Sequence, residues 1–145
     1  MEEKLYGLVI GTNGMAEIVE FPKEDKLGWY YKTIGCDLID IVKPYGLEEV
    51  AKEYDLQSMI GKFSLVVDDE GLLKPEPEVN PIASLLYGCD DHGQALFGTV
   101  VVVKDEETPE GLDSVGMDGG DMMLLQAAIN SLIERHNEKV GEANG

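Results

Sequence analysis

The chain has 145 residues, enough for one domain with a substantial core, and 43% of them are hydrophobic, as in ordinary globular proteins. Its charge is unusual, because 29 acidic residues stand against 11 basic ones and give a formal net charge of −18 at pH 7. Such a surface repels phosphate groups, which argues against direct binding to nucleic acids and to anionic membrane surfaces.

The first predicted element is a β-hairpin in the sequence LYGLVIGTNGMAEIVEF, residues 5–21. Asn13-Gly14 separates two runs of β-forming residues, and Asn-Gly is the preferred centre of a two-residue type I′ turn. That turn predicts two facing pairs across the hairpin, Leu8 with Val19 and Tyr6 with Phe21. The hairpin would then have one strongly apolar face.

Two amphipathic helices and two strands are predicted next. Apolar residues recur at helical spacing twice, at Leu27, Tyr30, Tyr31 and Ile34 and again at Leu47, Val50, Ala51 and Tyr54. Gly35 is a natural end for the first helix. Trp29 lies off the first stripe, so we expect its side chain to be exposed. The run from Cys36 to Val42 and the sequence KFSLVV (62–67) are predicted strands.

Residues 68–88 combine an acidic turn, a proline-rich passage and a short helix. Asn80 is expected to cap the free amides of that helix, and Pro81 suits its first position. The stretch is therefore predicted to be a structural connector. A further hypothesis is that it borders a shallow pocket in which Asn80, Tyr87 and His92 present polar groups to a ligand.

The last part of the chain is predicted to contain the central strand and a long helix. LFGTVVVV (96–103) is continuously apolar, as expected of a strand covered on both faces. Residues 105–121 are rich in acids and glycine and lack basic residues, which predicts a mobile acidic loop. A helix with one apolar stripe begins near Asp121, and residues 141–145 form a frayed tail.

Together these elements predict a single α+β domain over residues 1–145. We expect a mainly antiparallel sheet of about five strands with helices packed against it, the last helix lying across one face.

The cysteine content and the amino terminus indicate a cytoplasmic location. Cys36 and Cys89 do not form the pattern of a disulfide framework, and the first residues lack the features of a signal peptide. The longest mainly apolar run, 96–103, is far shorter than the roughly 20 residues that a membrane helix needs.

The densest group of reactive residues is CDDHG, residues 89–93. Cys89 and His92 have the spacing of half a zinc site, but Cys36 and His136 are the chain's only further soft ligands and no second paired motif exists. No third group orients a Cys–His catalytic pair. The prediction is therefore a polar turn, with no metal, no cofactor and no catalytic residue.

Four short segments occur in a fixed order: DLIDIV (37–42), LVVDDEGLLK (65–74), NPIASLLYG (80–88) and HGQALFGTVVVV (92–103). In this order they resemble a family of small uncharacterised domains, catalogued as a domain of unknown function, that is common in bacteriophages, plasmids and conjugative elements. The resemblance covers about residues 4–104. It implies a setting among the accessory genes of mobile elements, and it assigns no catalytic residue.

Three hypotheses for function remain open. The first is a non-enzymatic binding protein of a phage or mobile element that acts on a host protein or a small ligand. The second is an acidic mimic of nucleic acid that inhibits a basic host defence or DNA-handling protein. The third is a small enzyme with an unrecognised site near Tyr87–Gln94. The sequence leaves the oligomeric state open.

Overall fold

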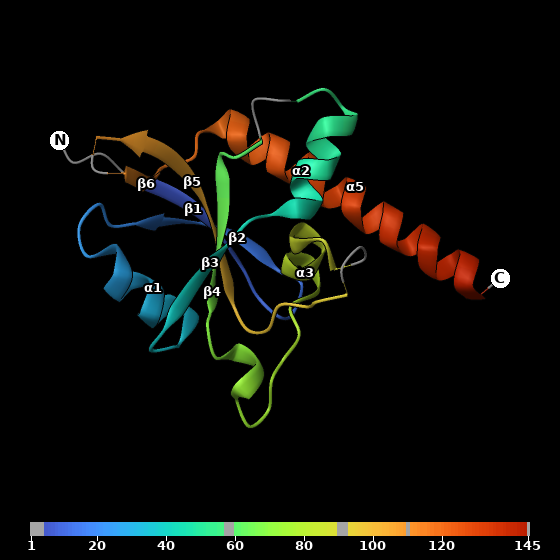
Figure 1. Cartoon of the computed structure of the whole chain (residues 1–145), viewed down its shortest axis with the longest axis horizontal. Coiled ribbons are helices and arrows are strands. Elements are labelled where there is room, and N and C mark those ends of the chain that lie inside the picture. Colours follow the sequence, from blue (N-terminus) through green and yellow to red (C-terminus); the bar gives the residue numbers. More distant parts are fainter. Residues whose placement is uncertain (1–4, 57–59, 90–92, 110, 145) are drawn as a thin grey trace.

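An antiparallel sheet organises the fold in the computed structural model, which describes residues 5–56, 60–89, 93–109 and 111–144 (Figure 1). Within these residues the strand order is β2-β1-β5-β4-β3, and β6 pairs with β5. The strands are β1 (Leu5–Ile10), β2 (Ala16–Phe21), β3 (Ile39–Val42), β4 (Phe63–Asp68), β5 (Val100–Thr108) and β6 (Gly111–Val115). The predicted α+β class and the mainly antiparallel sheet are confirmed.

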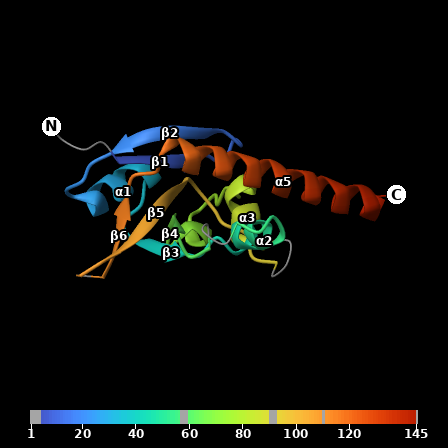
Figure 2. The same cartoon turned by 90° about the horizontal axis from the view of Figure 1, so that it is seen from above.

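Helices cover both faces of this sheet (Figure 2). They are α1 (Lys26–Ile34), α2 (Tyr45–Glu53), α3 (Pro81–Tyr87) and α5 (Gly119–Asn144), with a short 3-10 helix at Gly71–Leu73. Helix α1 lies on one face, and α2, α3 and α5 lie together on the other. The last helix therefore does cross one face of the sheet, as the sequence predicts.

Strand β5 lies at the centre of the sheet and separates two hydrophobic cores. Its side chains alternate, so Val100 and Val102 enter the core under α2, α3 and α5, and Val101 and Val103 enter the core under α1. Each of these four valines is at most 1% exposed. Burial on both faces explains why this segment is continuously apolar.

The register of the β1–β2 hairpin differs by one residue from the prediction. Leu8 faces Ile18, and Tyr6 faces Glu20. The turn has three residues in place of two, because the Gly11 N–H donates to the Met15 carbonyl (2.9 Å) and Gly14 takes a left-handed φ of 81°. Since side chains alternate along a strand, this shift abolishes the single apolar face that was predicted.

The predicted acidic loop, residues 105–121, contains regular structure. Strand β5 continues to Thr108, and β6 returns beside it with Lys104 opposite Val115 and Thr108 opposite Gly111. The composition was misleading, because a hairpin ladder satisfies the backbone whatever charge its side chains carry. Two neighbouring elements support it: Ser64 donates to the Asp105 carboxylate, and Lys26 pairs with Asp113 at 2.7 Å.

Helix α5 is longer than predicted at both ends. It begins at Gly119 and continues to Asn144, where a frayed tail over residues 141–145 was expected. Asp118 and Asp121 cap its start reciprocally, since each backbone N–H donates to the other's carboxylate (3.0 and 2.8 Å). Residues 137–141 are exposed, and this end of the helix extends beyond the sheet (Figures 1 and 2).

Two local contacts set the positions of the short helices. A Cβ on Gly46 would lie 2.1 Å from the Leu85 carbonyl oxygen, so α2 approaches α3 at a distance that only glycine permits. On the other face, Trp29 is partly buried, with its ring 5.5 Å from that of Phe21. The expectation that Trp29 is exposed was wrong, because Phe21 of β2 packs against it. Leu27, which the predicted apolar stripe includes, is instead 49% exposed.

Candidate functional site: a groove between α2 and α5

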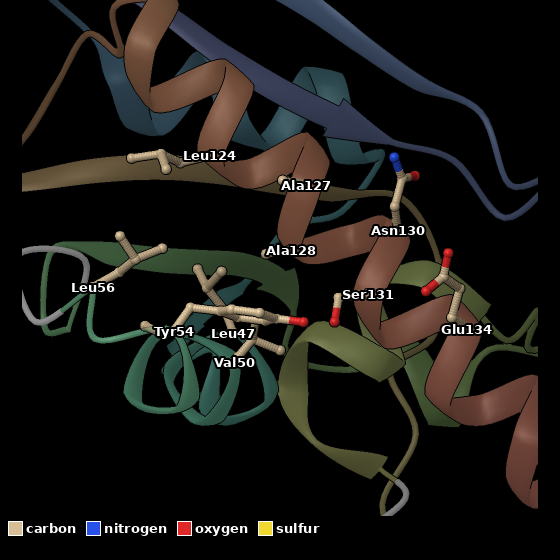
Figure 3. A pocket seen from close by; sticks show the side chains of 11 residues that line it. Leu47, Val50, Tyr54, Leu56, Leu124, Ala127, Ala128, Asn130, Ser131 and Glu134 are labelled. Atoms are coloured by element: carbon tan, nitrogen blue, oxygen red, sulfur yellow. The ribbon is translucent and has the colours of Figure 1, made fainter.

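A groove of about 490 Å³ lies between helices α2 and α5 (Figure 3). We call it the α2–α5 groove. Its lining is mainly apolar on the α2 side and includes small and polar side chains on the α5 side. The lining residues are Leu47, Val50, Ala51, Tyr54, Leu56, Leu124, Ala127, Ala128, Asn130, Ser131 and Glu134.

Small side chains create the space between the two helices. Leu47, Val50 and Ala51 of α2 are buried in the core that Leu125 and Ala128 of α5 share, so the helices touch at the base of the groove. Towards solvent, α5 presents alanine and serine where larger residues would close the gap. Two packed helices leave a cleft where the residues on their outer flanks are small. At such positions the side chains of one helix are too short to fill the space beside the other.

The two ends of the groove differ in polarity. Leu56 and Leu124 lie at one end, and Asn130 and Glu134 lie at the other (Figure 3). Between them the Tyr54 ring lies along the groove, with its hydroxyl directed towards Ser131. Tyr54 is 61% exposed, so its ring is available to a ligand. The arrangement suits a molecule with an apolar body and one polar end.

An ion pair connects the two walls. Arg135 of α5 donates to the Glu53 carboxylate of α2, and these residues are the sequence neighbours of Glu134 and Tyr54. Both partners are partly accessible to water, so the pair contributes modestly to stability. It links α2 and α5 beside the groove without lining it.

The structure places Asn80 in the core. Its side-chain N–H₂ group donates to the carbonyls of Ile10 and Gly98, both at 2.9 Å, and its Oδ1 accepts from the Ala83 N–H at 3.1 Å. The predicted helix cap is therefore confirmed. The two donated bonds also connect α3 to β1 and to the segment before β5, and a ligand could contact Asn80 only by replacing these bonds.

Of the other two predicted ligand-binding residues, the structure describes only Tyr87. Tyr87 is partly buried, and its ring centroid lies 6.1 Å from that of Tyr45. His92 lies outside the described residues, as do Asp90 and Asp91. A ligand-binding role for these residues, and an enzymatic site near Tyr87–Gln94, stay predictions.

The reactive side chains that are described form no metal site. Within the described ranges, no three His, Cys, Asp or Glu residues lie close enough to hold a metal ion. Cys36 and Cys89 are free thiols. Burial raises the pKa of the Cys36 thiol and the nearby negative charge of Asp68 raises it further, so Cys36 is protonated at neutral pH and a poor nucleophile.

Exposed carboxylates are spread over the molecule. They occur on both outer strands, as Glu17 of β2 and Asp40 of β3, before α1 at Asp25 and on α5 at Glu134 and Glu138. They therefore lie on both faces and both edges of the sheet.

No protein-family model, curated protein sequence or solved structure matches this chain. None of the described helices combines the length and apolar composition that a membrane span needs. The groove itself had no signal in the sequence. Leu47, Val50, Ala51 and Tyr54 were predicted as one face of a helix, but nothing local indicates that this face meets α5.

Proposed function

We propose that the chain is a non-enzymatic binding protein that holds a small amphipathic molecule in the α2–α5 groove. The observation that carries this proposal is the groove of about 490 Å³ with its mainly apolar lining. Small-molecule sites typically have volumes of about 300–1,000 Å³ and a few polar groups that orient the ligand. The polar groups of Tyr54, Asn130 and Ser131 are well placed to orient a ligand in the groove.

The polarity of the groove indicates which end of the ligand lies where. An apolar body of aliphatic or aromatic character would contact Leu47, Val50 and Leu124, and a cationic or hydrogen-bond-donating end would face Glu134. The net charge of −18 gives the whole surface a negative potential, which attracts cations and repels anions. The preferred ligand is therefore an amphipathic amine.

The setting is part of the same proposal. A role as a cytoplasmic accessory protein of a phage or other mobile element is supported by the order of the four segments in the sequence, and the two free thiols suit a reducing compartment. The alternative of an acidic nucleic-acid mimic has less support, because exposed carboxylates occupy both edges and both faces of the sheet.

Three probes with one apolar body test the ligand class: phenylbutylamine, phenylbutanol and phenylbutyrate, each titrated by calorimetry into the full chain. We expect the amine to bind most tightly and the carboxylate least. Glu134→Gln should narrow the difference between amine and alcohol, because it removes the charge at the polar end of the groove.

A matched pair of variants tests the location. Ala127→Phe fills the groove, whereas Asn137→Phe places the same side chain at an exposed position farther along α5. Displacing about 50 Å² of buried apolar contact should weaken binding of the amine about tenfold. Equal affinities for the three probes, or equal effects of the two variants, would rule out the proposal.

A further inference from the structure

The two terminal strands of the order β2-β1-β5-β4-β3 differ in how well their outer edges are closed. At one edge, β3 has only four residues, Ile39–Val42. The Asp69 N–H donates to the Leu38 carbonyl at 3.0 Å, so in the alternating ladder only Ile39 and Ile41 direct backbone groups outward. The Asp40 carboxylate already accepts the Ile41 N–H at 2.9 Å. A short strand whose outward N–H group is already hydrogen-bonded within the strand is a protected edge.

Among the described residues, the β2 edge is longer, and its outward groups at Ala16 and Ile18 are not covered in this way. β2 has six residues, and within the described chain it pairs with β1 alone. The bond from the Gly11 N–H to the Met15 carbonyl fixes the alternation, so Ala16, Ile18 and Glu20 direct their N–H and C=O groups away from β1. All three residues are exposed, with Ile18 at 59%. Figure 2 shows β2 on the outer side of β1.

We propose that the β2 edge is a docking site for an extended basic segment of a partner protein, which adds to the sheet as an antiparallel strand. The outward backbone groups supply the hydrogen bonds of this mode of recognition, and side chains supply its specificity. Glu17 and Glu20 are exposed on opposite faces of β2, and the molecule carries a net charge of −18. Charge complementarity therefore selects lysine and arginine in the added strand.

The register of β2 defines the preferred sequence. Along an antiparallel partner, successive residues face Glu20, Val19, Ile18 and Glu17. The exposed Ile18 and the half-exposed Val19 favour apolar partners, and the two glutamates favour basic ones. The expected pattern is basic–apolar–apolar–basic. This is more specific than attraction to any basic surface, because it fixes the spacing between the two basic residues and places two apolar residues between them.

A second copy of the chain is a poorer occupant of this edge. Symmetric pairing of two β2 strands would bring together two molecules that each carry a net charge of −18, with Glu17 and Glu20 of both in one narrow strip. The acidic β2 edge therefore attracts a basic segment and repels a second copy of the chain.

The peptide Thr-Lys-Val-Ile-Lys-Thr provides a direct test with the unmodified full chain. In the predicted register its isoleucine faces Ile18 and directs its N–H to β2, whereas its valine directs its N–H away. N-methylation of the isoleucine should weaken binding at least about tenfold, because it removes a backbone hydrogen bond and crowds the edge. N-methylation of the valine is the matched control and should leave affinity nearly unchanged.

Amide chemical-shift mapping by NMR locates the site, and salt tests its electrostatic part. We expect shifts in residues 16–20 and in β1, and weaker binding when salt is raised from about 0.1 M to about 1 M, which shortens the screening length from roughly 10 to roughly 3 Å. Glu17→Lys should weaken binding of the basic peptide and strengthen binding of the acidic peptide Thr-Glu-Val-Ile-Glu-Thr.

The Ile18 backbone can be tested in the protein as well. Its N–H faces away from β1, so Ile18→Pro removes an outward donor without removing a ladder bond, and Ile18→Ala controls for the lost side chain. Proline should weaken peptide binding more than alanine does. Equal effects of the two N-methylated peptides, absence of binding, shifts in the α2–α5 groove, or self-association through β2 would each overturn the proposal.

Discussion

The two halves of strand β5 are held in place by different physical effects. Val100–Val103 is buried between the two cores, and its position follows from the removal of apolar surface from water. Lys104–Thr108 carries three acids in succession. It continues past the end of β4 and pairs with β6. Its position depends on ladder hydrogen bonds and on Ser64, Lys26 and Asp121 from other elements. The hydropathy pattern therefore predicts the first half as a strand but gives no indication of the second.

The largest expected effect comes from the anchor at the start of the apolar half. Asn80→Ala removes the bonds to Ile10, Gly98 and Ala83, two of which bridge β1 and the approach to β5. We expect it to lower the free energy of unfolding by about 2–4 kcal/mol, because buried carbonyls lose their donors and α3 loses its cap. Urea denaturation measures this change.

A second variant at the same position separates the two roles of Asn80. Asn80→Ser keeps an oxygen that can cap α3 but lacks the two amide donors. If the bridge between strands matters most, serine should be nearly as destabilising as alanine. If serine restores most of the stability, the cap dominates and the apolar half of β5 needs no anchor.

The charged half predicts a smaller, pH-dependent effect. Burial raises the pKa of Asp121, but the hydrogen bonds from the Asp118 N–H and the Lys104 ammonium outweigh it and leave this pKa below its usual value. A carboxyl with a lowered folded pKa stabilises the protein above its unfolded pKa of about 3.9, and this contribution is lost as pH falls through the folded value.

Lys104→Met tests this linkage. At pH 7 it should lower the free energy of unfolding by about 1 kcal/mol, because the 3.0 Å ion pair with Asp121 is partly buried. The difference from the unaltered protein should shrink as the pH falls towards and below the folded pKa of Asp121. A difference that stays constant with pH would show that the methionine acts through packing alone.

The same contrast explains what the sequence could and could not predict. Val100–Val103 and the Asn80 cap are local patterns of hydropathy or backbone chemistry, and both were predicted correctly. The stripe of α1 was correct only in part, because Tyr30 is buried but Leu27 is 49% exposed. The register of β1–β2 was missed because Asn13-Gly14 is compatible with two- and three-residue turns, and the choice depends on packing against the rest of the sheet.

The β5–β6 hairpin and the α2–α5 groove were missed for a related reason. Each depends on contacts between segments far apart in the chain, such as Ser64 with Asp105, or Tyr54 beside Ser131. Residue composition alone cannot indicate which distant elements meet. A groove is harder still to predict, because it arises where small side chains leave space and no residue pattern marks that space.

The smallest expected effect distinguishes repulsion from attraction within the charged half. Glu106 lies opposite Asp113 in the β5–β6 ladder, and like charges at facing positions destabilise a pair of strands. Glu106→Gln should therefore stabilise the hairpin by a few tenths of a kcal/mol, roughly the size of one cross-strand pair. Lys26→Met should have the opposite sign, because Lys26 pairs with Asp113 at 2.7 Å.

Amide hydrogen exchange in β6, relative to Val101 and Val102 of β5, measures both variants against an internal standard. We expect slower exchange in Glu106→Gln and faster exchange in Lys26→Met, with the valine amides unchanged in both. If charge has no part in positioning this half, both variants should leave β6 exchange as it was, and the ladder hydrogen bonds alone would account for the hairpin. Slower exchange in one variant and faster exchange in the other would show that charge helps to position the hairpin. Individual positive charges such as Lys26 would then offset the repulsion between its acidic residues.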